Sequence, residues 1–171
     1  MELSNSQSID GRSCYDATPV ERNTRTIRLL RLARSAEPHE ICCDLDCFSL
    51  ETRPEYTALS YTWGSSTPSK IIHVNGIPFA VRANLDHFLD RERTAAHQKY
   101  YWIDAICINQ ARTDERNHQV GLMRDIYSSV NALRLIHGHL LTNVTGGCRT
   151  GLAGARRSEA GASNGLSPRN T

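Results

Sequence analysis

The sequence has 171 residues, of which 39% are hydrophobic and 22% charged, and its formal net charge is +2. This length and composition are typical of a single globular domain. The near-neutral charge gives no electrostatic reason to expect nucleic acid or an anionic membrane as a partner. No apolar stretch approaches the roughly 20 residues of a membrane span, and the start, MELSNSQSIDGRSCYD, lacks the pattern of a secretory signal. We therefore expect a cytoplasmic protein whose cysteines are reduced thiols.

Composition divides the chain into three zones. Residues 1–23 are polar and show little hydrophobic periodicity, so we expect a disordered leader. Residues 24–137 hold every Trp and Phe, and every Tyr except Tyr15, and we expect them to form the folded domain. Residues 138–171 hold seven of the eleven Gly and no aromatic side chain. That zone has too little apolar surface to offset the entropy of ordering, so we expect a low-complexity, disordered tail.

The folded zone opens with two β-prone segments. TIRLLRL, residues 26–32, alternates weakly between apolar and polar side chains, and EICCDLDCFSL, residues 40–50, alternates more clearly. In the second segment one face carries Ile41, Cys43, Leu45 and Cys47, and the other carries Cys42, Asp44 and Asp46. With His39 close by, Cys42, Cys43 and Cys47 admit either a zinc site or buried structural thiols. Zinc ligands usually come as spaced pairs separated by a loop, so we favour structural thiols and predict no metal.

The remaining elements alternate between strands and helices. Strands are predicted over 57–61, 99–104 and 132–136, and helices over 84–96 and 114–129. A β-hairpin is predicted early in the series, because Asn75-Gly76 separates the β-prone runs IIHV and IPFAV. This order predicts an α/β fold, in which helices flank a partial parallel sheet that carries the inserted hairpin.

Each predicted helix has an apolar face. Asn84 is expected to cap the first helix, and its buried residues are expected to be Leu85, Phe88 and Leu89. The buried stripe of the second helix is expected to be Val120, Met123, Ile126, Tyr127 and Val130. Glu115 and Arg116 admit an acid/base or ion-pair role, but Glu115 lies in the first turn of that helix, where the helix dipole favours anions, so we interpret it as a dipole partner. Arg116 and Gln119 are expected on the solvated or loop-facing side.

Two polar and aromatic clusters follow predicted strands. In open α/β sheets, ligands bind beyond the carboxyl ends of the strands. The clusters there are Tyr61, Trp63 and Gly64 after one strand, and Asp104, Asn109 and Gln110 after another. If the strands are parallel neighbours, Trp63 and Asp104 lie along a common rim. In the structural alternative, which is the commoner role for such residues, Asp104 accepts N–H bonds from its own loop while Asn109 and Gln110 hold the following turn.

No catalytic residue can be assigned from motifs. The sequence contains no G-x-S-x-G, no P-loop, no G-x-G-x-x-G and no histidine pattern of a metallohydrolase. The common hydrolase and nucleotide-binding motifs are therefore absent, and the polar residues at the predicted rim are the candidates for a functional site.

Three blocks of the sequence resemble the successive motifs of the fungal heterokaryon incompatibility (HET) domain. The blocks are YTALSYTWG, VNGIPFAVRANLDHFL and YYWIDAICINQARTDERNHQVGLMRDIYSSV. The resemblance runs from about Thr26 to Ile136. It implies a role in fungal non-self recognition and programmed cell death, through self-association and protein partners. The family-motif residues at the rim are Tyr61, Trp63, Gly64, Asp104, Asn109, Gln110, Glu115, Arg116 and Gln119.

The resemblance also implies a fold similar to Toll/interleukin-receptor (TIR) domains, with ALSY, YWID and ALRLI as the first three strands. Some TIR domains cleave NAD with a glutamate that follows the third strand. Its counterpart would fall beyond Ile136, where no residue matches, and Glu159 lies in the low-complexity zone. We therefore expect no cofactor and no enzyme, with NAD cleavage as the alternative. The family pattern breaks off at LIHGHLL, so a truncated, non-functional fragment is a third interpretation.

Overall fold

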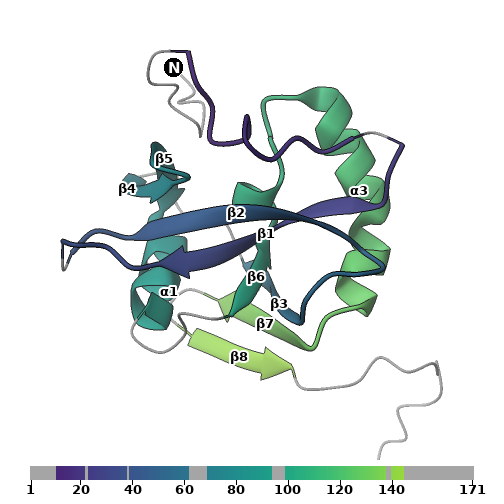
Figure 1. Ribbon diagram of the computed structural model, residues 1–171. Helices are drawn as coiled ribbons and strands as arrows, with labels where there is room; N and C mark the ends of the chain where they lie inside the picture. The colour runs from purple at the N-terminus through teal and green to yellow at the C-terminus, as the bar shows by residue number, and fades with distance from the viewer. Residues whose placement is uncertain are drawn as a thin grey trace, which may run out of the picture.

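The computed structural model describes residues 11–21, 23–37, 39–61, 69–93, 99–137 and 140–144. Its strands are β1 (Thr26–Ala33), β2 (Cys42–Ser49), β3 (Tyr56–Tyr61), β4 (Ser69–Val74), β5 (Ile77–Arg82), β6 (Tyr100–Ile103), β7 (Ala132–His137) and β8 (Leu140–Val144). Its helices are α1 (Ala83–Arg93), α2 (Asp104–Cys107) and α3 (Thr113–Ser128). Figure 1 labels these elements on the ribbon. The predicted strands, hairpin and two long helices are all present, so the α/β prediction is confirmed.

The strands form one mixed sheet in the order β5-β4-β2-β1-β6-β3-β7-β8. The three inner strands β6, β3 and β7 run parallel to one another, as predicted. β1 pairs antiparallel with both β2 and β6, and the outer pairs β4–β5 and β7–β8 are also antiparallel. The β-α-β-α-β unit therefore forms a parallel centre, and the remaining strands extend it on both sides, with a second, short parallel pairing between β2 and β4.

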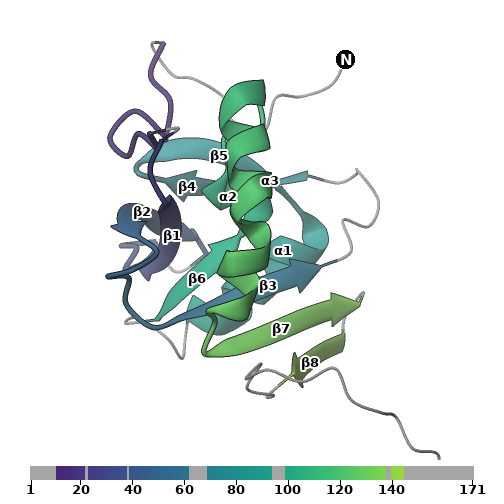
Figure 2. The same cartoon turned by 90° about the vertical axis from the view of Figure 1, so that its right-hand side faces the viewer.

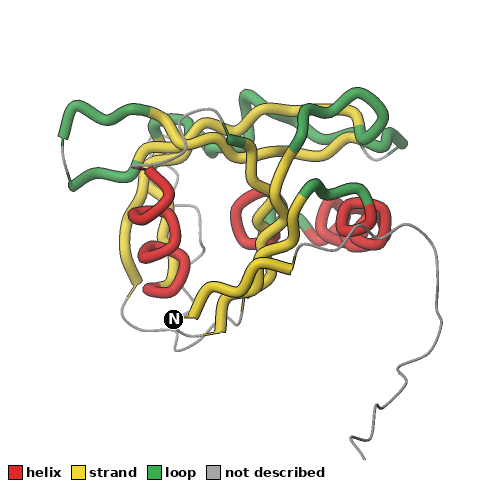
Figure 3. The backbone as a smooth tube through the Cα atoms, turned by 90° about the horizontal axis from the view of Figure 1, so that it is seen from below, coloured by secondary structure: helices red, strands yellow, loops and turns green. Residues whose placement is uncertain are grey.

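The two long helices lie on opposite faces of the inner strands (Figure 3). The connections β3–α1–β6 and β6–α3–β7 cross the sheet in opposite directions, so right-handed crossovers place their helices on opposite faces. The sheet curves around α1, which contacts β1, β4 and β5. Figure 2 shows α3 in front of the other face, with its outer side turned away from the sheet.

The position of β6 in the core explains why its sequence, YYWI, is a continuous apolar run. Tyr101, Trp102 and Ile103 of β6 are all fully buried, because helices cover both faces of this inner strand. Leu85, Phe88 and Leu89 form the buried face of α1, as predicted. α1 begins at Ala83 rather than after Asn84. The predicted cap is therefore wrong, because β5 runs into α1 without an intervening loop.

The β4–β5 turn has the geometry that its sequence predicts. Asn75 and Gly76 both have positive φ, at 51° and 74°. Two consecutive left-handed residues define a type I′ turn, and Asn-Gly is the dipeptide that adopts it most readily. The turn also holds β2, because Asn75 Oδ1 accepts a hydrogen bond of 2.9 Å from the Leu45 N–H.

Two expectations about the chain ends are wrong within the described residues. Cys14 and Tyr15 belong to the hydrophobic core, so residues 11–21 are not a disordered leader. Their contacts are made with residues far along the chain, which local periodicity cannot reveal. β8 pairs antiparallel with β7, so the domain extends past residue 137. The predictions of disorder for residues 1–10 and 145–171 lie outside the described residues. None of the helices described could span a membrane.

Candidate functional site

The candidate site is the rim, which we define as the carboxyl ends of β3 and β6 together with the loop of residues 104–112. β3 and β6 are parallel neighbours in which Leu59 pairs with Ile103. Asp104 follows β6 directly, and Tyr61 ends β3 at the same edge of the sheet. The predicted side-by-side arrangement of the two strand ends is confirmed. Trp63 and Gly64 lie outside the described residues, so the structure does not place them along the rim.

Asp104 begins α2 and is only partly buried. Its Oδ1 atom accepts a hydrogen bond of 2.7 Å from the Ala105 N–H. Burial raises the pKa of the Asp104 carboxyl, and the Ala105 N–H opposes this rise without cancelling it. Burial, together with the charge of Asp104, also raises the pKa of Tyr127 on α3 to about 12. Asp104 is therefore a carboxylate held in a low-dielectric setting at the sheet edge.

Asn109 and Gln110 hold the loop that follows Asp104. Gln110 Nε2 donates a hydrogen bond of 2.9 Å to the Asp104 carbonyl oxygen. Asn109 Oδ1 accepts from the Ala111 N–H at 3.2 Å, closing an Asx turn. These contacts are the ones that the structural interpretation of the two amides predicts.

Glu115 forms a buried ion pair with Arg28 of β1. The guanidinium Nη1 lies 2.5 Å from Oε1, Nη2 lies 3.2 Å from Oε2, and the two side chains are 1% and 6% exposed. Glu115 Oε1 also accepts a hydrogen bond of 2.8 Å from the Asn109 N–H. The interpretation of Glu115 as a dipole partner alone is therefore wrong, because its main partner is a cation 87 residues away in the sequence.

Arg28 is the site residue that the sequence analysis missed. Besides Glu115, its Nε donates to the Thr18 carbonyl oxygen at 2.6 Å and its Nη1 donates to the Cys107 carbonyl oxygen at 3.2 Å. Its guanidinium carbon lies 4.7 Å from the centre of the Tyr15 ring, and the Tyr15 hydroxyl donates to the Ile108 carbonyl oxygen at 3.2 Å. Arg28 thus joins the N-terminal segment, α2 and α3. The sequence signal was an arginine between apolar residues of a strand, but Arg31 of the same strand has the same setting and is partly exposed, so the signal does not single out Arg28.

The buried face of α3 differs from the predicted stripe. Gln119 is buried and its Nε2 donates a hydrogen bond of 2.9 Å to the Thr26 carbonyl oxygen, so its predicted solvated position is wrong. Val120 is 53% exposed, so it does not belong to the buried stripe. Ile126 is buried, and Met123, Tyr127 and Val130 pack partly against the core, as predicted. The buried face of α3 is rotated relative to the predicted stripe, because the polar residues Glu115 and Gln119 face β1. Arg116 is exposed, as predicted.

The cysteines of the described part of the chain all carry free thiols. Cys43 and Cys107 are buried in the core, and burial raises the pKa of the Cys107 thiol to about 12. Cys47 is half-buried, and its Sγ lies 3.5 Å from the Pro19 carbonyl oxygen. Cys43 therefore fills space in the core, as the structural interpretation predicts, and Cys47 lies at its margin, whereas Cys42 is only partly buried.

Comparison with known proteins identifies one family and one relative. The family model described as heterokaryon incompatibility protein (HET) matches residues 56–146, which is more than half of the chain. Heterokaryon incompatibility protein 6, OR allele, from Neurospora crassa is 35% identical over 131 residues, which cover 68% of this chain and 19% of that protein. No solved structure matches the chain significantly. The family match includes β8, which again extends the domain beyond residue 137.

Proposed function

The chain belongs to the heterokaryon incompatibility family, and we propose that it acts in fungal non-self recognition by signalling programmed cell death through self-association. The proposal places the chain in the cytoplasm. The observation that carries it is the contrast between two sets of residues. One set consists of family-motif residues that are used inside the domain, and the other is a set of exposed residues on one face of α3, of which Arg116 belongs to the family motif.

The first set consists of side chains whose contacts lie within the protein. It contains Asn109, Gln110, Glu115 and Gln119. Asn109 and Gln110 hold the loop 104–112 together, and Glu115 and Gln119 join α3 to β1. These contacts stabilise the fold, and this role is sufficient to explain the four residues. They therefore give no evidence of binding or catalysis.

The second set lies on the outer side of α3. Arg116 and Val120 are exposed and one helical turn apart, and Arg124 is exposed one turn further along. Val120 and Ile71 are the two exposed large hydrophobic residues among those described. Arginines around an apolar side chain are typical of protein–protein contact surfaces, where arginine is enriched. We take this α3 face, Arg116, Val120 and Arg124, as the contact surface for a second copy.

The strand order supports the proposed kinship with TIR domains. In the β-α-β-α-β unit the first strand, β3, lies between the second, β6, and the third, β7. This is the 2-1-3 order of flavodoxin-like doubly wound sheets, in which ligands bind beyond the carboxyl ends of the strands. NAD cleavage is the second candidate function, favoured by Asp104 at that edge. The sequence from residue 132 to residue 158 contains no Asp or Glu, so we rank NAD cleavage below signalling.

Induced expression of the 171-residue chain in a filamentous fungus tests the proposal. We expect growth arrest and staining of dead cells, and we expect Val120→Glu and Arg116→Glu to restore growth. The matched control is Ile71→Glu, which places the same charge at an equally exposed apolar position on β4 and should still arrest growth. Healthy colonies that contain the intact wild-type chain would contradict the proposal and favour the non-functional fragment.

A further inference from the structure

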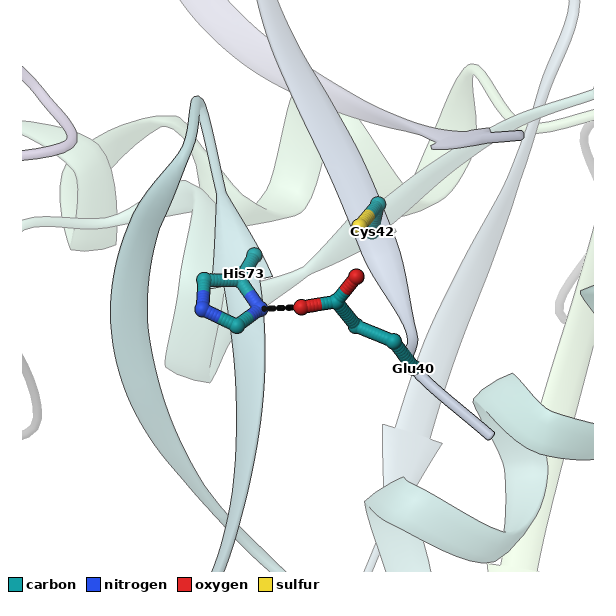
Figure 4. Close-up of side chains that lie close together, drawn as sticks. All are labelled: Glu40, Cys42 and His73. Carbon is teal, nitrogen blue, oxygen red and sulfur yellow. Dashed lines mark ion pairs between the residues drawn. The ribbon is translucent and has the colours of Figure 1, made fainter. Parts of the chain in front are cut away.

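The outer face of the β2–β4 junction brings together a carboxylate, a thiol and an imidazole. β2 and β4 are parallel neighbours, and Cys42 pairs directly with His73. The next pair, Cys43 and Val74, is buried in the core, so Cys42 and His73 project together from the opposite face. Figure 4 shows Glu40, just before β2, turned toward the His73 ring beside Cys42.

The three donor atoms are close enough to share one ion. Glu40 Oε1 lies 2.8 Å from His73 Nδ1. With Cys42 Sγ, the donor atoms of this group all lie within 4.8 Å of one another. In a tetrahedral zinc site, Zn–N and Zn–S bonds of about 2.0–2.3 Å put neighbouring donors roughly 3.3–3.6 Å apart. Small rotations of the three side chains would therefore give the separations that zinc requires.

The surroundings of these atoms suit a bound cation. The Glu40 carboxylate is held in place by the Ser35 hydroxyl, which donates a hydrogen bond of 2.8 Å to Oε2. His73 Nδ1 is shielded from solvent, and its neighbour is the Glu40 carboxylate with which it forms an ion pair. Partners that orient a ligand carboxylate strengthen metal binding. Glutamate, cysteine and histidine are all ordinary zinc ligands, and the thiolate disfavours magnesium and calcium, which prefer oxygen.

From this geometry we propose that Glu40, Cys42 and His73 form a zinc-binding site, with the fourth position open to water. The Cys42 thiol loses its proton to solvent when the Zn–S bond forms. The ladder that joins the β4–β5 hairpin to β2 is short, because it consists of two residue pairs. Bound zinc would join the two strands across it. Glu40 and Cys42 precede residue 56, where the family match begins, and none of the three residues belongs to the α3 face proposed for self-association.

Cobalt(II) titration of the purified 171-residue chain tests the site. We expect one equivalent to bind, with thiolate-to-cobalt charge-transfer absorption and the visible bands of a tetrahedral complex, and we expect zinc to remove both. Cys42→Ser and His73→Asn should each weaken binding by at least about tenfold. Cys47→Ser, which removes a half-buried thiol from the same strand, and His39→Asn should leave the titration unchanged.

Thermal unfolding gives a second measurement. Zinc should raise the Tm of the wild-type chain and of Cys47→Ser, and should leave the Tm of Cys42→Ser unchanged. Circular dichroism of the variants checks that they fold, and Glu40→Gln, which changes only a partly exposed carboxylate, should also bind more weakly. Absence of the charge-transfer band in the wild-type chain, or a band that survives Cys42→Ser, would overturn the proposal.

Discussion

Arg28 of β1 and Glu115 of α3 lie 87 residues apart in the sequence and form a two-point ion pair in the interior of the protein. Removing one partner leaves the other as an uncompensated buried charge, whereas removing both leaves none. The pair therefore joins β1 to α3, and each charge is stable in the interior only while the other is present.

Glu115→Ala should destabilise the domain by about 3–5 kcal/mol, because Arg28 is then buried without its counter-charge. Urea unfolding of the variant measures the change. The double variant Arg28→Met/Glu115→Leu should lose less stability than either single variant. Arg25→Ala is the matched control, because Arg25 forms exposed ion pairs with Glu51 and Asp125 and should change the unfolding curve little. A Glu115→Ala chain as stable as Arg25→Ala would contradict the buried pair.

Tyr15→Ala should destabilise the domain by about 3 kcal/mol or more, as expected for removal of a buried aromatic side chain. Tyr15 packs under the Arg28 guanidinium and its hydroxyl donates to Ile108, so both contacts are lost. Chemical unfolding followed by tryptophan fluorescence measures the effect. A Tyr15→Ala chain that is as stable as the wild-type chain would show that residues 11–21 do not pack on the domain in solution.

Asp104→Asn should make the domain more stable at neutral pH. The folded-state pKa of Asp104 is raised by burial, so the carboxyl binds its proton more tightly in the folded chain than in the unfolded chain. The ionised group therefore opposes folding at pH 7, and this penalty disappears as the pH falls through the folded and then the unfolded pKa. The Asn amide oxygen can still accept from Ala105. Unfolding at pH 7 and at about pH 4 should show a gain that is larger at pH 7 than at pH 4; a loss at pH 7 would mean that the carboxylate itself stabilises the rim.

Tyr101→Phe should destabilise the domain by about 1.5–3 kcal/mol at neutral pH, because Tyr101 donates a hydrogen bond to the buried carboxylate of Glu92. Burial alone would raise the pKa of Glu92, but the hydrogen bonds from Tyr101 and Arg134 outweigh it and lower the pKa. The stabilisation is thus present above the unfolded pKa of Glu92 and is lost as the pH falls through the lower folded pKa. The control is Tyr100→Phe, which should have a smaller effect at pH 7, because the Tyr100 hydroxyl makes a 3.3 Å contact with the partly exposed Asp46. Equal effects of the two variants would exclude the buried network.

Incubation of the purified chain with NAD should release no nicotinamide, since the sequence that follows β7 lacks a carboxylate before Glu159. Chromatographic analysis of the reaction measures the product. Nicotinamide release that is lost in Asp104→Asn would reverse the ranking of the two candidate functions and make Asp104 a catalytic residue.

Much of the fold follows from local patterns in the sequence. The run YYWI, the Asn75-Gly76 turn and the apolar face of α1 each carry a strong periodic or turn signal within a few residues, and each element lies where the pattern predicts. The meeting of the β3 and β6 ends was also predictable, because alternating strands and helices produce parallel neighbours. These inferences depend only on neighbours along the chain.

The parts that could not be predicted depend on contacts between distant residues. Gln119 is buried because it reaches Thr26, which lies 93 residues earlier, and this contact turns Val120 outward. The burial of Tyr15 likewise depends on Ile108 and Arg28. In the same way, Cys42 and His73 become neighbours only through the pairing of β2 with β4, whereas the sequence presented Cys42 among other cysteines.

We propose that copies of the chain contact one another through the α3 face of Arg116, Val120 and Arg124. Sedimentation velocity of the purified chain over a range of concentrations tests it most directly. We predict that the wild-type chain and Ile71→Glu sediment as a concentration-dependent mixture with a dimer or larger species, whereas Val120→Glu remains a folded monomer. A wild-type chain that stays monomeric at the highest concentration, or a Val120→Glu variant that associates as strongly as wild type, would contradict it.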